Sequence, residues 1–217
     1  MADADSRSGQ TYADPRVLAW LEEVHAPHDP GLAQAFEAPG REGIPAIQVG
    51  ISEGRALGLL LRMVGARNVV EIGTLAGYSA IWIARALSEG GRLHTIENDP
   101  HHAEVAQRNL TAAGVEDRVT IHVGGALDIL PTLESHGPFD AVFIDADKGS
   151  YDAYGRWAAA HVRQGGLLLG DNAFYFGNLL EESDAASAMR RFHEEAAEAF
   201  ETVCLPTPDG LLLGLRR

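Results

Sequence analysis

Polar residues that could bind a metal ion follow two apolar segments in the second half of the chain. Asp145 follows the segment AVFI, and Asp171 and Asn172 follow LLLG. Two carboxylates and an amide supply hard oxygen ligands, which suit Mg²⁺ and also Ca²⁺ or Mn²⁺. The acids could instead cap the helices that follow them. Because neighbouring carboxylates without a cation repel each other, we expect Asp145, Asp171 and Asn172 to be metal ligands.

Lys148 lies three residues beyond Asp145, close to this expected metal. A lysine beside a cation has its ammonium form disfavoured and can accept a proton near neutral pH. We therefore expect Lys148 and Asp145 to be catalytic, although a surface ion pair with Asp145 or Asp147 would explain the lysine equally well. The histidines show no zinc-ligand spacing, and His101-His102, at a helix start, is expected to be solvated.

Two glycines four residues apart, Gly73 and Gly77, follow the apolar segment that begins near residue 68. A dinucleotide-binding loop has the pattern G-x-G-x-x-G. Leu75 and Tyr78 occupy its second and third glycine positions, which argues against NAD and FAD. Glu71 would repel a pyrophosphate but attract a ligand that carries a sulfonium and an ammonium group. The loop could also be a tight strand-to-helix turn that binds nothing.

Glu97 ends the second apolar segment. An acid in that place can accept the hydroxyl groups of an adenosine ribose, and the alternative is a solvated strand-end carboxylate. Small residues, Gly124, Gly125 and Ala126, follow the third segment. They leave room for an adenine ring, or they form a capped turn.

Alternating elements must position these residues. Short apolar segments alternate with amphipathic helical stretches, which predicts a doubly wound α/β domain with a mostly parallel sheet covered on both faces. Ligands bind such sheets beyond the carboxyl ends of the strands. A C-terminal antiparallel hairpin at the sheet edge is expected from Leu211–Leu215 and the residues around Val203. The expected strands are Val69–Ile72, Leu93–Ile96, Val119–Val123, Ala141–Ile144 and Leu167–Leu169, and the expected helices are Tyr78–Leu87, His102–Ala113, Ala126–Leu133, Tyr151–His161 and Ala185–Ala199.

Residues 1–50 are expected to be a tail and a helical appendage of a single domain that spans 1–217. Met1–Gln10 is polar and is expected to be frayed, and Asp14 caps a helix that begins at Pro15. The stretch Ala38–Pro45 is rich in Pro and Gly and is expected to be broken. Ser52 is expected to cap the next helix.

The bulk composition disfavours several classes of binding partner. The net charge of −14 disfavours nucleic acid and anionic lipid, and no apolar stretch reaches the ~18 residues of a membrane span. The one cysteine, Cys204, excludes an internal disulfide. We therefore expect a cytoplasmic protein that acts on a small molecule.

The strand-end segments resemble the cation-dependent caffeoyl-CoA and catechol O-methyltransferase family. The resemblance covers about Ile51 to Phe176, and PDGLLLGLRR resembles the closing hairpin of the family. FIDADK with a later DN is quite specific, whereas the glycine loop is shared by many methyltransferases. The other matching segments are VVEIGTLAGYSAIWIA, LHTIENDP, GALDILP and LLLGDNAF.

This resemblance implies a class I methyltransferase fold, S-adenosylmethionine as cofactor, and a homodimer with the N-terminal helices near the interface. It implies Lys148 as the base and Asp145, Asp171 and Asn172 as the metal ligands. Val49 stands where the family often has Thr, so only a backbone contact is expected there. The implied cofactor contacts are Val49, Glu71, Gly73, Thr74, Tyr78, Ser79, Glu97, Ala126, Asp145 and Asp147.

The expected reaction is methyl transfer to one hydroxyl of a catechol-like aromatic diol that the metal holds through both oxygens. Tyr175 and Phe176 either stack on this acceptor or belong to the core. The acidic charge argues against a coenzyme A ester. Two alternatives remain open, which are methylation of a hydroxylated wobble uridine in tRNA and a non-catalytic cofactor-binding role.

Overall fold

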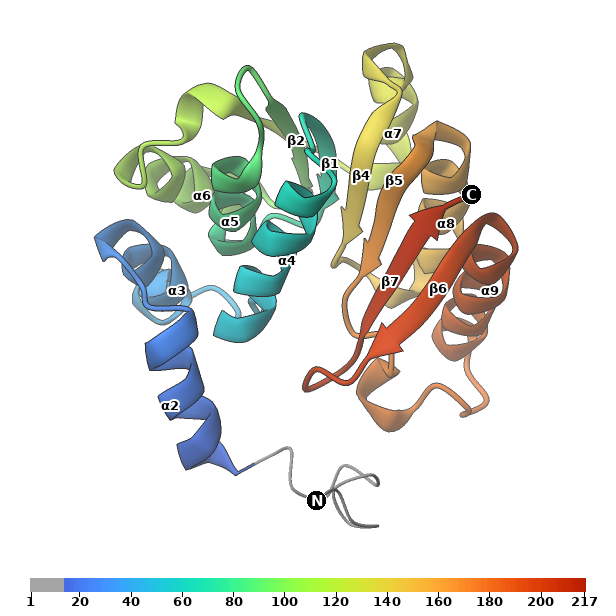
Figure 1. The fold of residues 1–217 in the computed structure, drawn as a ribbon, viewed down its shortest axis with the longest axis horizontal. Helices are drawn as coiled ribbons and strands as arrows, with labels where there is room; N and C mark the ends of the chain where they lie inside the picture. The colour runs from blue at the N-terminus through green and yellow to red at the C-terminus, as the bar shows by residue number, and fades with distance from the viewer. Residues whose placement is uncertain (1–13) are drawn as a thin grey trace.

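A seven-stranded sheet organises the chain in the computed structural model, which describes residues 14–217 (Figure 1). Its strand order is β3-β2-β1-β4-β5-β7-β6. β1 to β5 are parallel, and β7 and β6 form the expected antiparallel hairpin at the edge. The doubly wound α/β prediction is therefore confirmed. The strands are β1 (Asn68–Ile72), β2 (Arg92–Glu97), β3 (Val119–Val123), β4 (Phe139–Ile144), β5 (Val162–Gly170), β6 (Phe200–Leu205) and β7 (Leu211–Arg216).

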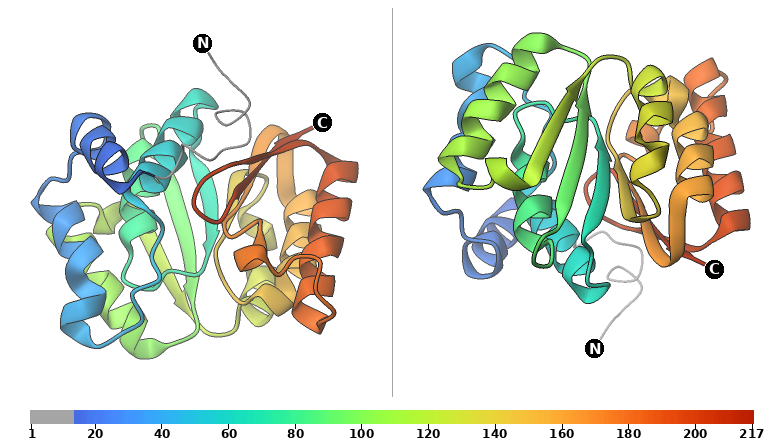
Figure 2. Two further views of the ribbon diagram at one scale, coloured as in Figure 1. Left: turned by 90° about the horizontal axis from the view of Figure 1, so that it is seen from below. Right: turned by 90° about the horizontal axis from the view of Figure 1, so that it is seen from above.

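Helices cover both faces of this sheet (Figure 2). α4 (Ile51–Met63), α5 (Tyr78–Ala86) and α6 (Pro100–Ala112) lie on one face, with α3 (Pro30–Glu42) packed outside them. The other face carries α7 (Ala126–Leu133), α8 (Tyr151–His161) and α9 (Asp184–Ala199). The short 3₁₀ turns are η1 (Glu116–Arg118), η2 (Glu134–His136), η3 (Lys148–Ser150) and η4 (Tyr175–Gly177). No helix between residues 14 and 217 is long and apolar enough to cross a bilayer.

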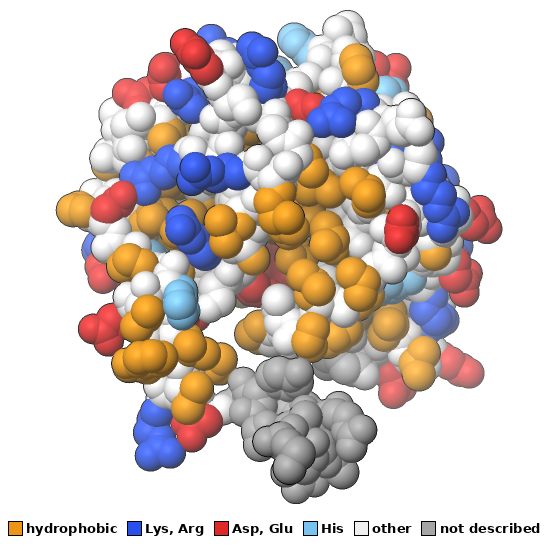
Figure 3. Space-filling view, in the orientation of Figure 1, with side chains coloured by type: hydrophobic (Ala, Val, Ile, Leu, Met, Phe, Trp, Pro, Cys, Tyr) orange, Lys and Arg blue, Asp and Glu red, His pale blue; other side chains and the backbone are white. Residues whose placement is uncertain are grey.

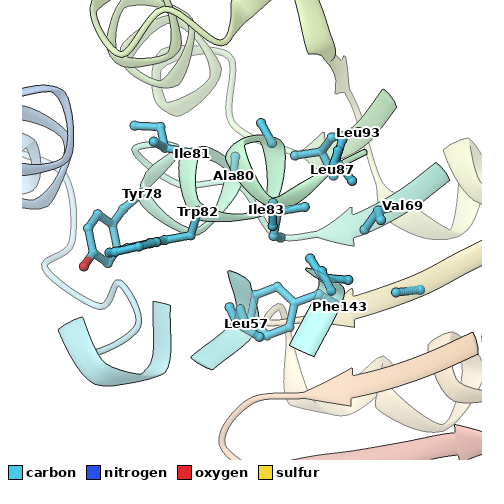
Figure 4. Close-up of a cluster of buried hydrophobic side chains, with 14 of the residues drawn as sticks. Leu57, Val69, Tyr78, Ala80, Ile81, Trp82, Ile83, Leu87, Leu93 and Phe143 are labelled. Atoms are coloured by element: carbon cyan, nitrogen blue, oxygen red, sulfur yellow. The ribbon is translucent and has the colours of Figure 1, made fainter. Parts of the chain in front are cut away.

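Alternate residues of the strands supply two cores, one on each side of the sheet. Val69, Leu93 and Phe143 pack beneath α4 and α5, where they meet Leu57 and Ile83 (Figure 4). Residues of opposite parity build the second core with α7, α8 and α9. Each fully buried Leu, Ile or Phe stabilises the fold by about 1.5–3 kcal/mol, so the central strands form a rigid platform.

One expectation about the N-terminal part is corrected at the end of α3. Ala38–Pro45 is not wholly broken, because α3 continues through Pro39 to Glu42 and ends at Gly43 with φ of 70°. Its buried side chains pack against α6, and this tertiary contact outweighs the weak helix propensity of the segment. The expectation for Met1–Gln10 lies outside the described residues.

The start of α4 also differs from the expectation. Ser52 lies inside the first turn, and Gly50 is the N-cap. Glu53 Oε2 accepts a hydrogen bond from the Gly50 N–H at 2.9 Å, which satisfies a backbone donor at the helix start. Asp14 does cap α2 (Pro15–His25), but α2 buries none of its residues.

Candidate active site

A cavity of about 800 Å³ opens at the carboxyl ends of the central strands. This is where a doubly wound sheet binds ligands. Among the residues singled out from the sequence, Glu71, Asp171 and Tyr175 do not line it. The predicted residues that do line it are Val49, Gly73, Thr74, Tyr78, Ser79, Glu97, Ala126, Asp145, Asp147, Lys148, Asn172 and Phe176.

The ends of β1, β4 and β5 are level, which brings the two predicted metal-binding acids together. Ile144 pairs with Gly170, so Asp145 and Asp171 are the next residues of neighbouring strands. The Asp145 N–H donates to the carbonyl of the residue that ends β1, and the Asp171 N–H donates to Ile144 O, both at 2.9 Å. The tertiary structure thus places both acids at the ends of neighbouring strands, and Asp145 lines the cavity.

Burial and mutual repulsion make these acids unfavourable as a pair of bare anions. Burial raises the pKa of Asp145, and the charge of Lys148 opposes this rise. Burial raises the pKa of Asp171 to about 8, with further contributions from the negative charges of Asp145 and Glu53. A divalent cation would relieve this repulsion, and the donor chemistry of two carboxylates with the Asn172 amide fits Mg²⁺. Within residues 14–217, no three His, Cys, Asp or Glu side chains form a metal-binding group.

Lys148 is held beside these acids. Its Nζ lies 3.3 Å from Asp145 Oδ1 and donates to Tyr151 Oη at 2.8 Å. Tyr151 is fully buried, and its hydroxyl donates to Asp171 O at 2.9 Å. Of the two partners that the sequence left open for the lysine, Asp147 instead accepts a hydrogen bond from the Tyr154 hydroxyl at 2.6 Å. The ion pair with Asp145 is thus present, but it lies in the cavity wall.

Two features of the sequence support a functional role for Lys148 and Tyr151. Lys148 is the only lysine of the chain, and all other basic residues that carry a fixed charge are arginines. An arginine cannot lose its proton at neutral pH, so a side-chain amine base has to be a lysine. Tyr151 was not anticipated, although it follows Lys148 by three residues, the spacing that brings two side chains together on one helical turn.

The conformation of the glycine loop is constrained by the end of the neighbouring strand β4. Gly73 has φ of 99°, and a Cβ there would lie 1.9 Å from the carbonyl oxygen of Asp145. Glycine therefore lets the ends of β1 and β4 touch. Leu75, at the position where a dinucleotide loop has its second glycine, adopts φ of 48°.

Glu71 is a buried carboxylate beside this loop. Thr95 Oγ1 donates to its Oε2 at 2.6 Å, and its Oε1 has no hydrogen-bond partner among the described residues. Burial raises the pKa of Glu71 to about 8, although hydrogen bonds from Ser79 and Thr95 oppose the rise. An unpartnered buried acceptor fits a cationic ligand group such as the ammonium of S-adenosylmethionine.

Glu97 lies across the loop and is fixed by backbone donors. Its Oε2 accepts from Leu75 N at 2.8 Å and its Oε1 from Asp99 N at 3.0 Å. His102 lines the cavity with Nδ1 at 3.5 Å from Glu97 Oε1, so the expectation of a solvated histidine pair is wrong for His102. The Asp99-Pro100 cap directs the first turn of α6 toward the cavity, and this signal could have identified the residue.

The two aromatic residues singled out after Asn172 differ in their surroundings. Phe176 is 64% exposed and lines the cavity, whereas Tyr175 packs against the core beneath the sheet. Asn172, Tyr175 and Phe176 all have φ near 50°. Such conformations are costly for residues other than glycine, so the surroundings must hold this segment in place.

Comparison with known proteins connects this geometry to a chemistry. A family model described as O-methyltransferase matches residues 22–217. A protein of Mycobacterium tuberculosis named catechol O-methyltransferase is 45% identical over 94% of this chain and 96% of its own length. The O-methyltransferase of Bacillus cereus, solved in complex with SAH, superposes with a TM-score of 0.89 at 36% identity, over 93% of this chain and 97% of that one. The O-methyltransferase TomG of Streptomyces achromogenes, solved with SAM, superposes with a TM-score of 0.87 at 37% identity, over 93% and 96% of the two chains.

Proposed function

Because the chain belongs to the O-methyltransferase family, whose relatives use S-adenosylmethionine, we propose that it methylates one hydroxyl of a vicinal aromatic diol held by a divalent cation. The observation that carries this proposal is the pair of Asp145 and Lys148 in the cavity wall, with the buried Asp171 at the end of the neighbouring strand. The two acids suit a bound cation, and the lysine beside Asp145 suits a proton acceptor.

The cation supplies Lewis-acid chemistry, which lowers the pKa of a phenolic hydroxyl from its usual value of ~10. Asp145, Asp171 and Asn172 would hold it. Lys148 would remove the proton of the reacting hydroxyl, and Tyr151 holds the lysine in position by accepting its hydrogen bond at 2.8 Å.

The cofactor contacts follow from the other side of the cavity. Glu71 would bind the ammonium group, Glu97 the ribose hydroxyls, and the backbone at Ala126 the adenine. We propose the remaining cofactor contacts at the loop and the β4 end, which are Val49, Gly73, Thr74, Tyr78, Ser79, Asp145 and Asp147. Holding both reactants in a near-attack arrangement supplies much of the rate acceleration.

The acceptor class follows from the cavity wall and from the relatives. Phe176 offers an exposed aromatic face beside Asn172. The Mycobacterium tuberculosis relative is named for catechol methylation. We propose a catechol-like small molecule as acceptor, and neither tRNA methylation nor a non-catalytic role gains support from these relatives.

Labelled S-adenosylmethionine tests the proposal directly. We expect transfer to catechol in Mg²⁺, little transfer to phenol or to a monomethylated catechol, and loss of transfer in EDTA that Mg²⁺ restores. Full activity in EDTA would contradict the metal, and equal rates with phenol would contradict the diol. Mn²⁺ and Ca²⁺ in parallel reactions rank the possible metals.

We also propose a homodimer formed through an apolar face. Figure 3 shows apolar side chains gathered over α2 and in the middle of the same face. α2 leaves Val17, Trp20 and Val24 exposed, and a gathered apolar face of this kind marks an interaction site. We expect light scattering to report a dimer for the wild type and a monomer for Trp20→Asp. A wild type that is monomeric at micromolar concentration would contradict the dimer.

A further inference from the structure

The segment that carries Asn172 and Phe176 is strained and is held from outside. Three of its non-glycine residues have φ of 48° to 53°. Such a conformation is unfavourable for most residues other than glycine and persists only where other contacts impose it. The side chains that meet the acceptor therefore depend on whatever imposes these angles.

The turn between β6 and β7 makes those contacts. Ala173 N donates to Gly210 O at 2.9 Å, and Phe174 N donates to Asp209 O at 2.8 Å. Phe176 N donates to the side-chain Oδ1 of Asp209, also at 2.8 Å. Three amides of the strained segment are thus bound by two adjacent residues of the hairpin turn.

The fit between the two segments is close. Gly210 has φ of 80°, and a Cβ there would lie 2.7 Å from the ring of Phe174. On the opposite side, His193 Nε2 lies 2.8 Å from Ala173 O. Any side chain at residue 210 would therefore displace the aromatic segment.

Ion pairing does not explain the aspartate of this turn. Its second oxygen, Oδ2, is buried and has no hydrogen-bond partner among residues 14–217. No salt bridge of Asp209 is present in that part of the chain. The side chain contributes one acceptor atom, which receives the N–H of the residue whose ring lines the cavity.

We propose that Asp209 is a positioning residue for the reaction. It fixes the backbone of residues 172–176, and through it the Asn172 amide and the Phe176 ring at the acceptor side of the cavity. We call the hydrogen bond from Phe176 N to Asp209 Oδ1 the clamp. Its effect on turnover rests on the proposed function, whereas the clamp itself does not. Because the hydrogen bond from Phe176 N–H needs an acceptor and no charge, Asp209→Asn retains it and Asp209→Ala removes it, whereas the bonds from residues 173 and 174 to backbone carbonyls of the turn remain in both variants.

Amide hydrogen exchange of the full chain tests the clamp without any acceptor. We expect the peptide that spans residues 173–178 to exchange at least roughly tenfold faster in Asp209→Ala, and at the wild-type rate in Asp209→Asn. The peptide over residues 73–79 should be unchanged. Gly210→Ala disturbs the same contact from its other side and should also speed exchange, and Glu201→Ala, at an exposed site of the same hairpin, is the control.

Kinetics then separates a positioning role from a structural one. In Asp209→Ala we expect the KM for catechol and the Mg²⁺ concentration for half-maximal rate to rise by roughly fivefold or more, with the Kd for SAH within twofold of wild type. Asp209→Asn should restore both. Unchanged exchange in Asp209→Ala would overturn the clamp, and faster exchange with unchanged KM would overturn its role in the reaction. A wild type that methylates no diol would contradict the proposed function, while the exchange result would still decide the clamp.

Discussion

The acids at the two sides of the cavity differ in the groups that surround them. On the side where we propose the cofactor, Glu97 accepts hydrogen bonds from backbone N–H groups and Glu71 accepts one from a threonine hydroxyl. On the side where we propose the acceptor, the negative charges of Asp145 and Asp171 act on each other, Lys148 Nζ lies 3.3 Å from Asp145 Oδ1, and Asn172 has φ of 53°.

This difference indicates that the two ligands would be bound by different interactions. Preformed hydrogen bonds hold the cofactor side in one arrangement before binding. On the proposed acceptor side, burial raises the pKa of Asp145 and Asp171, and a bound cation would favour their ionised forms. Substitutions on the two sides should therefore separate cofactor affinity from turnover.

The largest effect is expected from removing a carboxylate of the acceptor side. Asp171→Ala should lower kcat by on the order of a thousandfold, because several kcal/mol of Lewis-acid stabilisation are lost with the metal. SAH affinity by calorimetry should stay within a few fold. Asp128→Ala, at the cofactor end of the cavity, is the control, and a weakened SAH affinity in Asp171→Ala would break the comparison.

Replacing the lysine should cost less. Lys148→Met removes the proton acceptor and should lower kcat by roughly a hundredfold, within the usual range for general bases. The loss should shrink as pH rises, because hydroxide and the ionised diol replace the base. Lys148→Arg keeps the charge but cannot accept a proton, so it should be equally slow. A normal rate across mildly acidic to mildly alkaline pH in either variant would refute the assignment.

On the cofactor side the expected effect is on binding. Glu71→Gln should weaken SAH by roughly tenfold to a hundredfold, the value of a charge-assisted hydrogen bond, with a smaller change in kcat. Burial raises the pKa of Glu71 to about 8, so the free protein carries it protonated at pH 7. The ammonium of the ligand favours the ionised form, so binding at pH 7 should release a proton and affinity should rise with pH up to about 8. Calorimetry in two buffers measures this release, and an equal release from Glu71→Gln would contradict the assignment.

The smallest effect is expected at the aromatic wall. Phe176→Ala should raise the KM for catechol by roughly threefold to tenfold, which corresponds to one aromatic contact, and should leave SAH affinity unchanged. Phe176→Tyr keeps the ring and should behave like the wild type. An unchanged KM in the alanine variant would move the acceptor away from this wall.

Much of the site could be predicted because it lies at strand ends. β3, α7 and α8 have the expected bounds, and the central strands differ only at their ends. Apolar segments reveal buried parallel strands, and the residue after each segment then lies at the ligand edge. Asp145, Asp171 and Glu97 were found in this way.

Other parts of the site depend on segments that are distant in the chain. The residues around Phe176 are held by Asp209, 33 positions away, and no local pattern reports such a contact. Pro39 remains helical only because α3 packs on α6. Likewise, the sequence left Tyr175 and Phe176 equivalent, and the hairpin turn decides which ring faces the cavity.

The chain by itself therefore determined which chemical groups stand at the strand ends, because polarity and periodicity are local properties. Only the tertiary structure decided how those groups are oriented and supported. The turn at residues 209–210 owes its place beside Phe176 to packing between distant segments, whereas Tyr151 and His102 lie within about one helical turn of the residues that they support. Local propensity does not encode that packing, and it fixes the loop that would meet the acceptor.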